Sequence, residues 1–265
     1  MVAIDLQFWF LFPVAIGIAV IAMATGVSGA NFWVPVYLLW LHLDPQLGFW
    51  LSLVSMLIGF SSGVARNLRQ GTINFFLLRT SLITALPATV LGAVTARFVH
   101  PRWLFLGFAV FVFLYSTRVL AVLLGSGGVA PPKKDHIYWG AAAVGGVLTG
   151  LLTVGLGKFL LPSFLRHSRC QSPAEAVGTT VTAVFVASLC ASIIRLTPEL
   201  LAVLQTRSQQ LWNILLFVAP GVFIGGQIGP RVAANVSLIT LRCLLIGVLY
   251  LISGLMFLRF WFFIG

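Results

Sequence analysis

Long apolar segments separated by short polar stretches follow one another along almost the whole chain. Eight such segments occupy residues 8–42, 47–65, 73–97, 103–124, 138–165, 174–194, 209–230 and 238–262. Because a helix of about 20 apolar residues spans the hydrocarbon core of a bilayer, this pattern predicts an all-α integral membrane protein with several crossings.

The polar stretch "GSGGVAPPKKDH" divides the eight segments into two equal sets. We predict a first membrane repeat at 1–124, a linker loop at 125–137 and a second membrane repeat at 138–265. Equal halves of this kind are typical of transporters built from internal repeats.

Short motifs recur at matching places in the two halves. "NFWVP" (31–35) corresponds to "KFLLP" (158–162), and each follows a break of small, Gly-containing sequence, so Asn31 lies opposite Lys158. A proline followed by small residues spaced by four occurs in both 86–96 and 219–229. Two such matches favour a repeat over chance.

The first segment of each half contains the break, and two structures fit it. At 35 residues, 8–42 is too long for one untilted crossing. It is either a single long broken helix or a re-entrant hairpin whose tip is the break. A hairpin plus three crossings makes the halves inverted, whereas four full crossings make them parallel.

The positive residues favour the hairpins, because Lys and Arg accumulate on the cytoplasmic side. With hairpins, ten of them oppose five, and full crossings give a more even split. The ten are Arg66, Arg69, Arg79, Arg118, Lys133, Lys134, Arg166, Arg169, Arg231 and Arg242, and the five are Arg97, Arg102, Arg195, Arg207 and Arg259. We therefore predict inverted repeats, each a broken or re-entrant first helix plus three transmembrane helices, with the linker inside and both termini outside.

The two breaks predict a transport site. Bare backbone is tolerated at mid-membrane depth only where protein or a polar cavity encloses it. A short helix follows each break, and its N–H groups and positive dipole end favour an anion. The candidate substrate-binding residues are Lys158, Asn31, Gly29, Ala30, Gly155, Gly157, Ser28, Thr179, Thr180 and Ser52.

Within this site Lys158 supplies the counter-charge, Asn31 a hydrogen-bonding group, and the glycines and Ala30 their backbone amides. The alternative for Lys158 is snorkelling, since Arg166 follows only eight residues later and the lysine stem could reach an interface. The alternative for the hydroxyl groups is that they bond their own backbone.

Charge and chemistry narrow the function further. The net charge of +11 is distributed singly or in pairs between apolar runs, which indicates headgroup anchors to membrane lipids and no nucleic-acid partner. The three cysteines form no CxxC pair, so neither a metal site nor a cofactor is predicted.

No carboxylate lies mid-helix where a proton or Na⁺ relay would be expected, and Glu175 is interpreted as a partner of its helix dipole. The absence of HExxH, GxSxG and paired mid-membrane acids argues against an enzyme.

The chain resembles a known family in the two breaks, the proline four residues after Asn31 and after Lys158, the stretch "PAEAVGTT" and a P-x-x-x-x-G motif in both halves. This family is the TauE/SafE family of sulfite and organosulfonate exporters. The resemblance covers nearly the whole chain. It implies a multi-pass transporter of sulfite, sulfoacetate or related sulfonates in the plasma membrane, the inner membrane of a bacterium, and it suggests a homodimer. Family members usually carry consecutive glycines where this chain has Ala30–Asn31 and Gly157–Lys158, so Asn31 and Lys158 become candidates for setting its substrate preference.

The resulting prediction is an exporter of a small sulfur-containing anion that works by alternating access. A passive anion channel and an uptake permease for a different small oxyanion are the alternatives. Breaks in both halves favour alternating access. Export of an anion down a potential that is negative inside needs no coupling ion.

Overall fold

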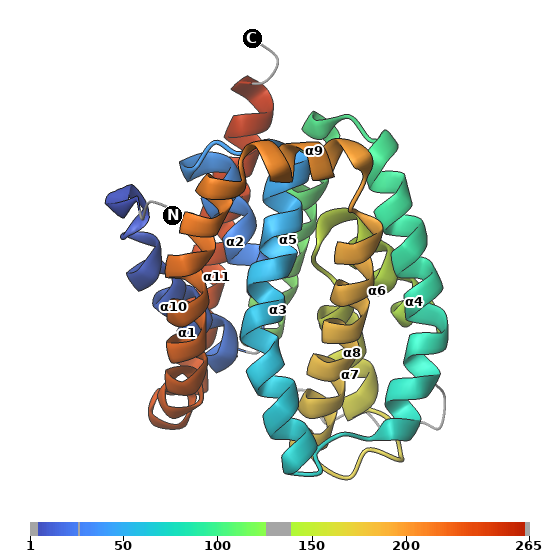
Figure 1. Ribbon diagram of the computed structural model, residues 1–265. Helices are drawn as coiled ribbons and strands as arrows, with labels where there is room; N and C mark the ends of the chain where they lie inside the picture. The colour runs from blue at the N-terminus through green and yellow to red at the C-terminus, as the bar shows by residue number, and fades with distance from the viewer. Residues whose placement is uncertain (1–4, 26, 126–138, 263–265) are drawn as a thin grey trace.

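The computed structural model of the protein is a bundle of helices and describes residues 5–25, 27–125 and 139–262 (Figure 1). Within these residues, seven helices are long and apolar enough to cross a membrane. They are Leu6–Thr25, Pro45–Arg69, Phe75–Phe98, Pro101–Leu124, Pro173–Ile194, Ser208–Gly229 and Ile239–Trp261. The all-helical, multi-pass prediction is confirmed.

The elements follow the predicted segments closely. The first half contains η1 (Leu6–Phe8), α1 (Leu11–Thr25), α2 (Ala30–Pro35), the π-helical turn η2 (Val36–Trp40), α3 (Pro45–Arg69), α4 (Phe75–Phe98) and α5 (Pro101–Leu124). The second half contains α6 (Trp139–Leu152), α7 (Leu156–Leu165), α8 (Pro173–Ile194), α9 (Pro198–Thr206), α10 (Ser208–Asn235) and α11 (Leu238–Phe262). Of the predicted linker 125–137, all but Gly125 lies outside the described residues. The division into repeats stays a prediction.

Proline marks the start of several helices, because its missing N–H is not needed in the first turn and its fixed φ suits the helix. The examples are Pro45, Pro101, Pro173 and Pro198. At α8 the preceding Ser172 also accepts a hydrogen bond from the N–H of Glu175, as a helix N-cap does. These signals explain why the chain turns sharply between crossings.

The first broken segment is a hairpin and not one long helix. The rings of Phe10, before α1, and Trp40, at the end of η2, are stacked with centroids 5.0 Å apart. Nearer the tip, a methyl group placed on Gly29 would lie 3.9 Å from Cβ of Ala22. The chain therefore returns along α1 to the place where it entered.

The second broken segment reverses in the same way. A methyl group on Gly155 of the break would lie 2.8 Å from Cβ of Leu148, and one on Gly145 would lie 3.4 Å from the ring of Phe159. These positions pair symmetrically about Leu152, as antiparallel arms do. Within the described residues, Trp139–Leu152 and Leu156–Leu165 are each shorter than the helix that a crossing requires.

The small-residue stripes lie at close helix contacts between the halves. A methyl group on Gly92 of α4 would collide with the carbonyl of Val147 on α6, and one on Gly150 of α6 with the carbonyl of Thr89. On α10, a methyl group on Gly225 would lie 2.5 Å from the carbonyl oxygen of Ile16 on α1. Each hairpin thus packs against a membrane helix of the other half, through backbones that approach closely.

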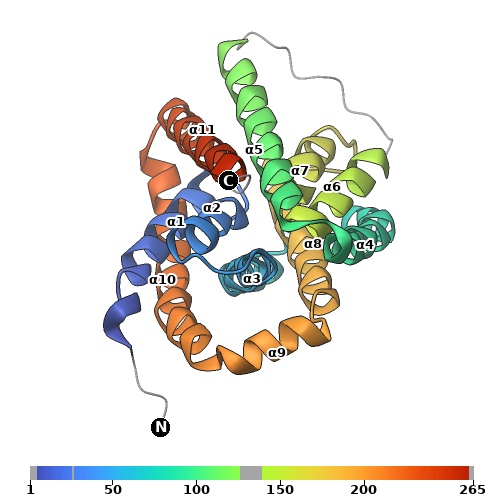
Figure 2. The ribbon, with the colours of Figure 1, turned by 90° about the horizontal axis from the view of Figure 1, so that it is seen from above.

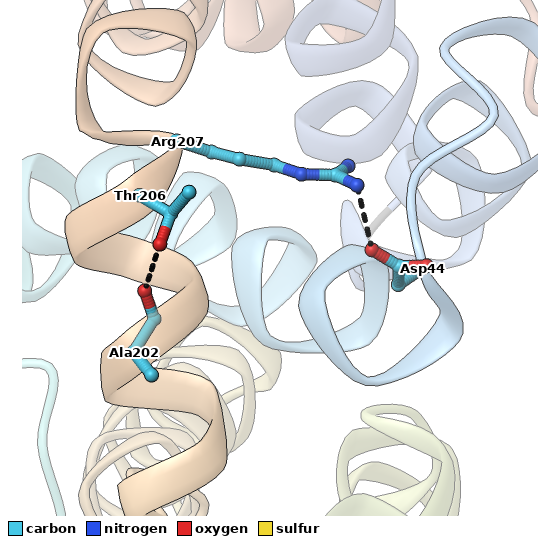
Figure 3. A network of polar contacts seen from close by, with 4 residues as sticks. All are labelled: Asp44, Ala202, Thr206 and Arg207. Carbon is cyan, nitrogen blue, oxygen red and sulfur yellow. Dashed lines mark hydrogen bonds and ion pairs between the residues drawn. The ribbon is translucent and has the colours of Figure 1, made fainter.

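Seen from above, α3 lies inside a ring of the other helices, and α9 runs across the end of the bundle between α8 and α10 (Figure 2). This short helix falls between two predicted segments and was not foreseen. Arg207, which follows α9, forms an ion pair of 3.3 Å with Asp44 at the start of α3 (Figure 3). The pair is partly exposed and contributes little free energy by itself. It ties α9 to the central helix.

The close contacts predict a clear difference between glycines. Gly150→Ala and Gly225→Ala should each destabilise the protein by about 1–3 kcal/mol, because a backbone must shift to admit the methyl group. Gly254→Ala is the matched control, since nothing lies within 4 Å of its added methyl group. Thermal unfolding of the purified proteins measures the effect. Equal midpoints for Gly150→Ala and Gly254→Ala would contradict this account of the packing.

Candidate anion site

Lys158 and Asn31 meet at the centre of the protein. Lys158 lies in the first turn of α7 with its side chain only 9% exposed, and Asn31 in the first turn of α2 is fully buried. The Lys158 Nζ donates a hydrogen bond of 2.8 Å to Oδ1 of Asn31. The two positions matched in the sequence are therefore in direct contact. The ammonium group lies inside the protein and does not extend to the surface.

The groups in direct contact with the Lys158 ammonium are neutral. It lies 4.4 Å from the ring centroid of Phe111 and 4.1 Å from that of Tyr115, both on α5, where the aromatic faces attract a cation. The ion pair that the described residues form joins Arg207 to Asp44 and does not involve Lys158. Lys158 is thus held by an amide oxygen and two rings, which leaves its charge without an anionic partner.

A cavity of about 410 Å³ opens beside Lys158. Among the residues that the structure describes, its lining includes four cationic side chains and no Asp or Glu. The cations are Lys158, Arg118, Arg166 and Arg242, and hydroxyl groups come from Thr25, Ser28, Tyr115, Thr149 and Thr153. A cavity lined by one sign of charge inside low-dielectric walls concentrates ions of the opposite sign.

The second break has an unusual backbone. Thr153 has φ +64° and Gly155 has φ +139°, a region that residues with a side chain rarely adopt. The Leu156 N–H donates to Oγ1 of Thr149 at 2.9 Å, and the Lys158 N–H donates to the carbonyl of Gly155 at 2.8 Å. The start of α7 is therefore fixed, and Lys158 leaves its first turn toward Asn31.

The first break is held by Asn31 itself. The Asn31 Nδ2 donates to the carbonyl of Ser28 at 2.7 Å, while its Oδ1 accepts from Lys158. The hydroxyl of Ser28 donates to Sδ of Met56 on α3. One amide side chain thus closes its own turn and joins the two breaks.

The structure brings together some of the predicted site residues and not others. Ser28, Gly155, Gly157 and Lys158 line the cavity. Ala30 is buried beside Asn31 in the first turn of α2. Gly29 lies against Trp33, whose Cδ1 would be 3.8 Å from an added methyl group.

The other predicted hydroxyl groups are engaged by the main chain. The hydroxyls of Ser52 and Thr180 donate to the carbonyls of Gly48 and Ala176, each at 2.7 Å. The Thr179 hydroxyl accepts from the N–H of Asn74 at 2.8 Å. None of the three belongs to the cavity lining.

Sequence reasoning missed part of the cavity. Arg118, Arg166 and Arg242 were interpreted only as headgroup anchors, yet all three line the cavity, as does Tyr115. The available signal was the place of Arg118, which interrupts the apolar segment 103–124 before its end.

The described carboxylates lie outside the cavity. Glu175 accepts hydrogen bonds from Nδ2 of Asn74 at 2.8 Å and from the N–H of Gln171 at 2.7 Å, so it fixes the turns before α4 and α8. Glu199 lies in the first turn of α9, where hydrogen bonds from its own N–H and from Thr197 hold its pKa below the usual value. Both have structural roles, as expected for acids at helix starts.

The seven candidate spans, together with the cationic cavity beside the buried Lys158, define a multi-pass membrane protein whose candidate site suits a small anion. The family model described as "Sulfite exporter TauE/SafE" matches residues 11–256, so the chain belongs to the TauE/SafE family. Members of this family are membrane transporters of sulfite and sulfonate-type anions and are not enzymes. Comparison with the curated proteins and with the solved structures finds no match.

The neutral contacts of Lys158 predict how its replacement changes the free energy of unfolding. In Lys158→Met without added anion, the free energy of unfolding should change by less than about 1 kcal/mol or increase, because a buried charge without a carboxylate partner is removed. Chemical or thermal unfolding in detergent measures it. A loss above about 3 kcal/mol, typical of a broken buried ion pair, would contradict this description of the site.

Proposed function

We propose that the protein exports a small sulfur-containing anion, such as sulfite, sulfoacetate or a related organosulfonate, across the plasma membrane, which in a bacterium is the inner membrane. The observation that carries the proposal is the buried Lys158 ammonium, which meets Asn31 of the other break beside a cationic cavity. The family supplies the class of substrate.

Lys158 is the counter-charge of the bound anion. An anionic oxygen attracts the ammonium through its full charge as well as through a hydrogen bond, whereas the amide oxygen of Asn31 is neutral, so the anion competes well for Lys158. Its arrival replaces the contact between Lys158 and Asn31. The amide of Asn31 and the backbone near Gly155 and Gly157 complete the site.

Exchange of partners at Lys158 couples binding to movement. The hydrogen bond between Lys158 and Asn31 joins the tip of one hairpin to the tip of the other. When the anion takes its place, the tips are joined only through the substrate, and their relative position changes. A ligand that binds two arrangements with different affinity shifts the population between them, as alternating access requires.

The anion enters from the cytoplasm. The cavity is lined by Arg118, Arg166 and Arg242, which the excess of positive residues assigns to the cytoplasmic side. The bound anion then leaves on the opposite side. A potential that is negative inside favours this direction by about 2.3 kcal/mol per charge per 100 mV, without a coupling ion.

The hairpins and their packing support two inverted repeats. Each half has one hairpin followed by three long helices, and each hairpin packs against a helix of the other half. Inverted repeats would let the same rearrangement close one side while it opens the other.

Binding to the purified protein tests Lys158. Calorimetric titration should show that sulfite and sulfoacetate bind to the wild type, with at least tenfold weaker binding in Lys158→Ala and partial retention in Lys158→Arg. Sulfate and a carboxylate analogue establish the selectivity. Equal affinities for the wild type and Lys158→Ala, with the fold intact, would contradict the assignment.

Asn31→Asp provides the matched test from the other side of the contact. The substitution keeps the shape of the side chain and places a carboxylate where Lys158 now meets an amide oxygen, 2.8 Å away. The internal carboxylate should pair with the Lys158 ammonium and exclude the anion, while loss of the Nδ2 donor to the Ser28 carbonyl offsets the gain in stability. Retained sulfite binding in a folded Asn31→Asp variant would show that the anion does not use this position.

Transport in liposomes separates an exporter from a passive channel. Protein reconstituted with internal sulfite should show saturable counterflow of labelled external sulfite, which a channel cannot perform. Anion currents that rise linearly with voltage and lack counterflow would favour the channel.

The arginines of the cavity should act on the rate of entry. At low salt, kcat/KM should fall several-fold in each of the variants Arg118→Gln, Arg166→Gln and Arg242→Gln. The difference in kcat/KM between each variant and the wild type should shrink when the salt concentration exceeds about 0.1 M, because the Debye length is then shorter than about 10 Å. Arg102→Gln is the control, because Arg102 lies at the other end of α5 and does not line the cavity. A loss that does not depend on salt would contradict electrostatic steering.

A further inference from the structure

Arg195 is a buried guanidinium that does not line the cavity around Lys158. It directly follows α8, where membrane proteins commonly place an exposed anchor, yet its exposed fraction is only 7%. Its Nε and Nη2 donate to the carbonyl of Gly150 at 3.1 and 2.8 Å, and Nη2 also donates to that of Leu151 at 2.7 Å. The side chain therefore points into the protein, onto the end of α6.

These two carbonyls are the ones that the second break leaves without helical partners. In a continuous helix, Gly150 and Leu151 would accept hydrogen bonds from the amides four residues later, at Val154 and Gly155. The helix ends at Leu152 and Thr153 adopts φ +64°, so those amides turn away. A buried carbonyl without a donor costs about 1–3 kcal/mol.

The charge of Arg195 also suits this position. The end of a helix carries partial negative charge, which a cation stabilises most when the pair is buried. The planar guanidinium reaches both carbonyls at once, whereas a lysine ammonium on the same stem acts as a point charge. Arg195 thus replaces the hydrogen bonds lost at the break and neutralises the exposed helix end.

We propose that Arg195 is a positioning residue for the anion site, which holds the second break in the conformation that directs Lys158 toward Asn31. The break is fixed from two sides, by Arg195 on the end of α6 and by Thr149 on the start of α7. Only a few residues separate Leu151 from Lys158, so movement of the α6 end shifts the ammonium. The inference deepens the proposed function and rests on Lys158 as the counter-charge of the anion.

Two hydrogen bonds at the first break are local. Thr25 Oγ1 donates to Ile21 within α1, and Asn31 Nδ2 donates to Ser28. At the second break, Arg195 adds donors from outside the hairpin, because it follows α8 and reaches the end of α6.

Arg97 provides a matched control. Its Nη2 also donates to a main-chain carbonyl, that of Ile194 at the end of α8, but its side chain is exposed. Water can replace an exposed donor and cannot replace a buried one. The comparison of Arg97→Met with Arg195→Met therefore separates a general loss of an arginine at this end of the bundle from the specific loss at the break.

The experiment uses the purified full chain with Arg195→Met, Arg195→Lys and Arg97→Met. Amide hydrogen exchange of segment 150–158, measured without any anion, should be at least tenfold faster in Arg195→Met, intermediate in Arg195→Lys and as in the wild type in Arg97→Met. Calorimetry with sulfite should give the same order, with affinity at least tenfold weaker in Arg195→Met.

Unchanged exchange in Arg195→Met, or equal losses in Arg97→Met, would overturn the inference. If Arg195→Met cannot be purified, Arg195→Lys tests the inference. Hydrogen exchange and sulfite affinity equal to those of the wild type in Arg195→Lys would contradict a role for the planar guanidinium. If the wild type binds no sulfite or sulfoacetate, the proposed function fails, and the exchange measurement alone still tests whether Arg195 holds the break.

Discussion

A bilayer offers no hydrogen bonds to an interrupted backbone, and the centre of this protein depends on that constraint. Two helices end at the breaks before Asn31 and before Lys158. Every polar group freed there needs a partner from the protein. Thr149, Arg195 and Asn31 supply such partners at the two breaks. The same contacts fix the direction in which Lys158 leaves its helix.

The electrostatics of the site follow from the Lys158 ammonium, which these contacts leave without an anionic partner. Several backbone groups at the breaks have partners within the protein, whereas the Lys158 ammonium has an amide oxygen and two aromatic rings in place of a carboxylate. A lysine in such surroundings is costly to maintain and is typical of a functional site. The additional arginines of the cavity extend the positive potential away from Lys158, so the site and its cavity favour the same sign of charge.

Much of this arrangement was predictable from the sequence. The apolar segments predicted the long helices α3, α4, α5, α8, α10 and α11 in their order, and the matched motifs identified Asn31 and Lys158, which lie in contact. The hairpin alternative at the first segment agrees with the stacking of Phe10 on Trp40. These features depend on local pattern and spacing, which a single sequence records directly.

The remaining features depend on where long side chains point. Arg195 and Arg118 are similar in sequence, each near the end of an apolar segment, yet Arg195 reaches a helix end and Arg118 lines the cavity. Hydropathy does not distinguish these cases, because the direction of each side chain is set by the neighbouring helices. The same reason explains why Phe111 and Tyr115 were not recognised as partners of Lys158, and why Thr179 bonds to Asn74 instead of facing the cavity.

A structure of the protein in a lipid nanodisc with saturating sulfite tests the central claim most directly. The account predicts an anion in contact with the Lys158 ammonium, in the place where Oδ1 of Asn31 now lies, with the Lys158–Asn31 hydrogen bond broken. An intact Lys158–Asn31 hydrogen bond, with sulfite bound only among Arg118, Arg166 and Arg242, would contradict it.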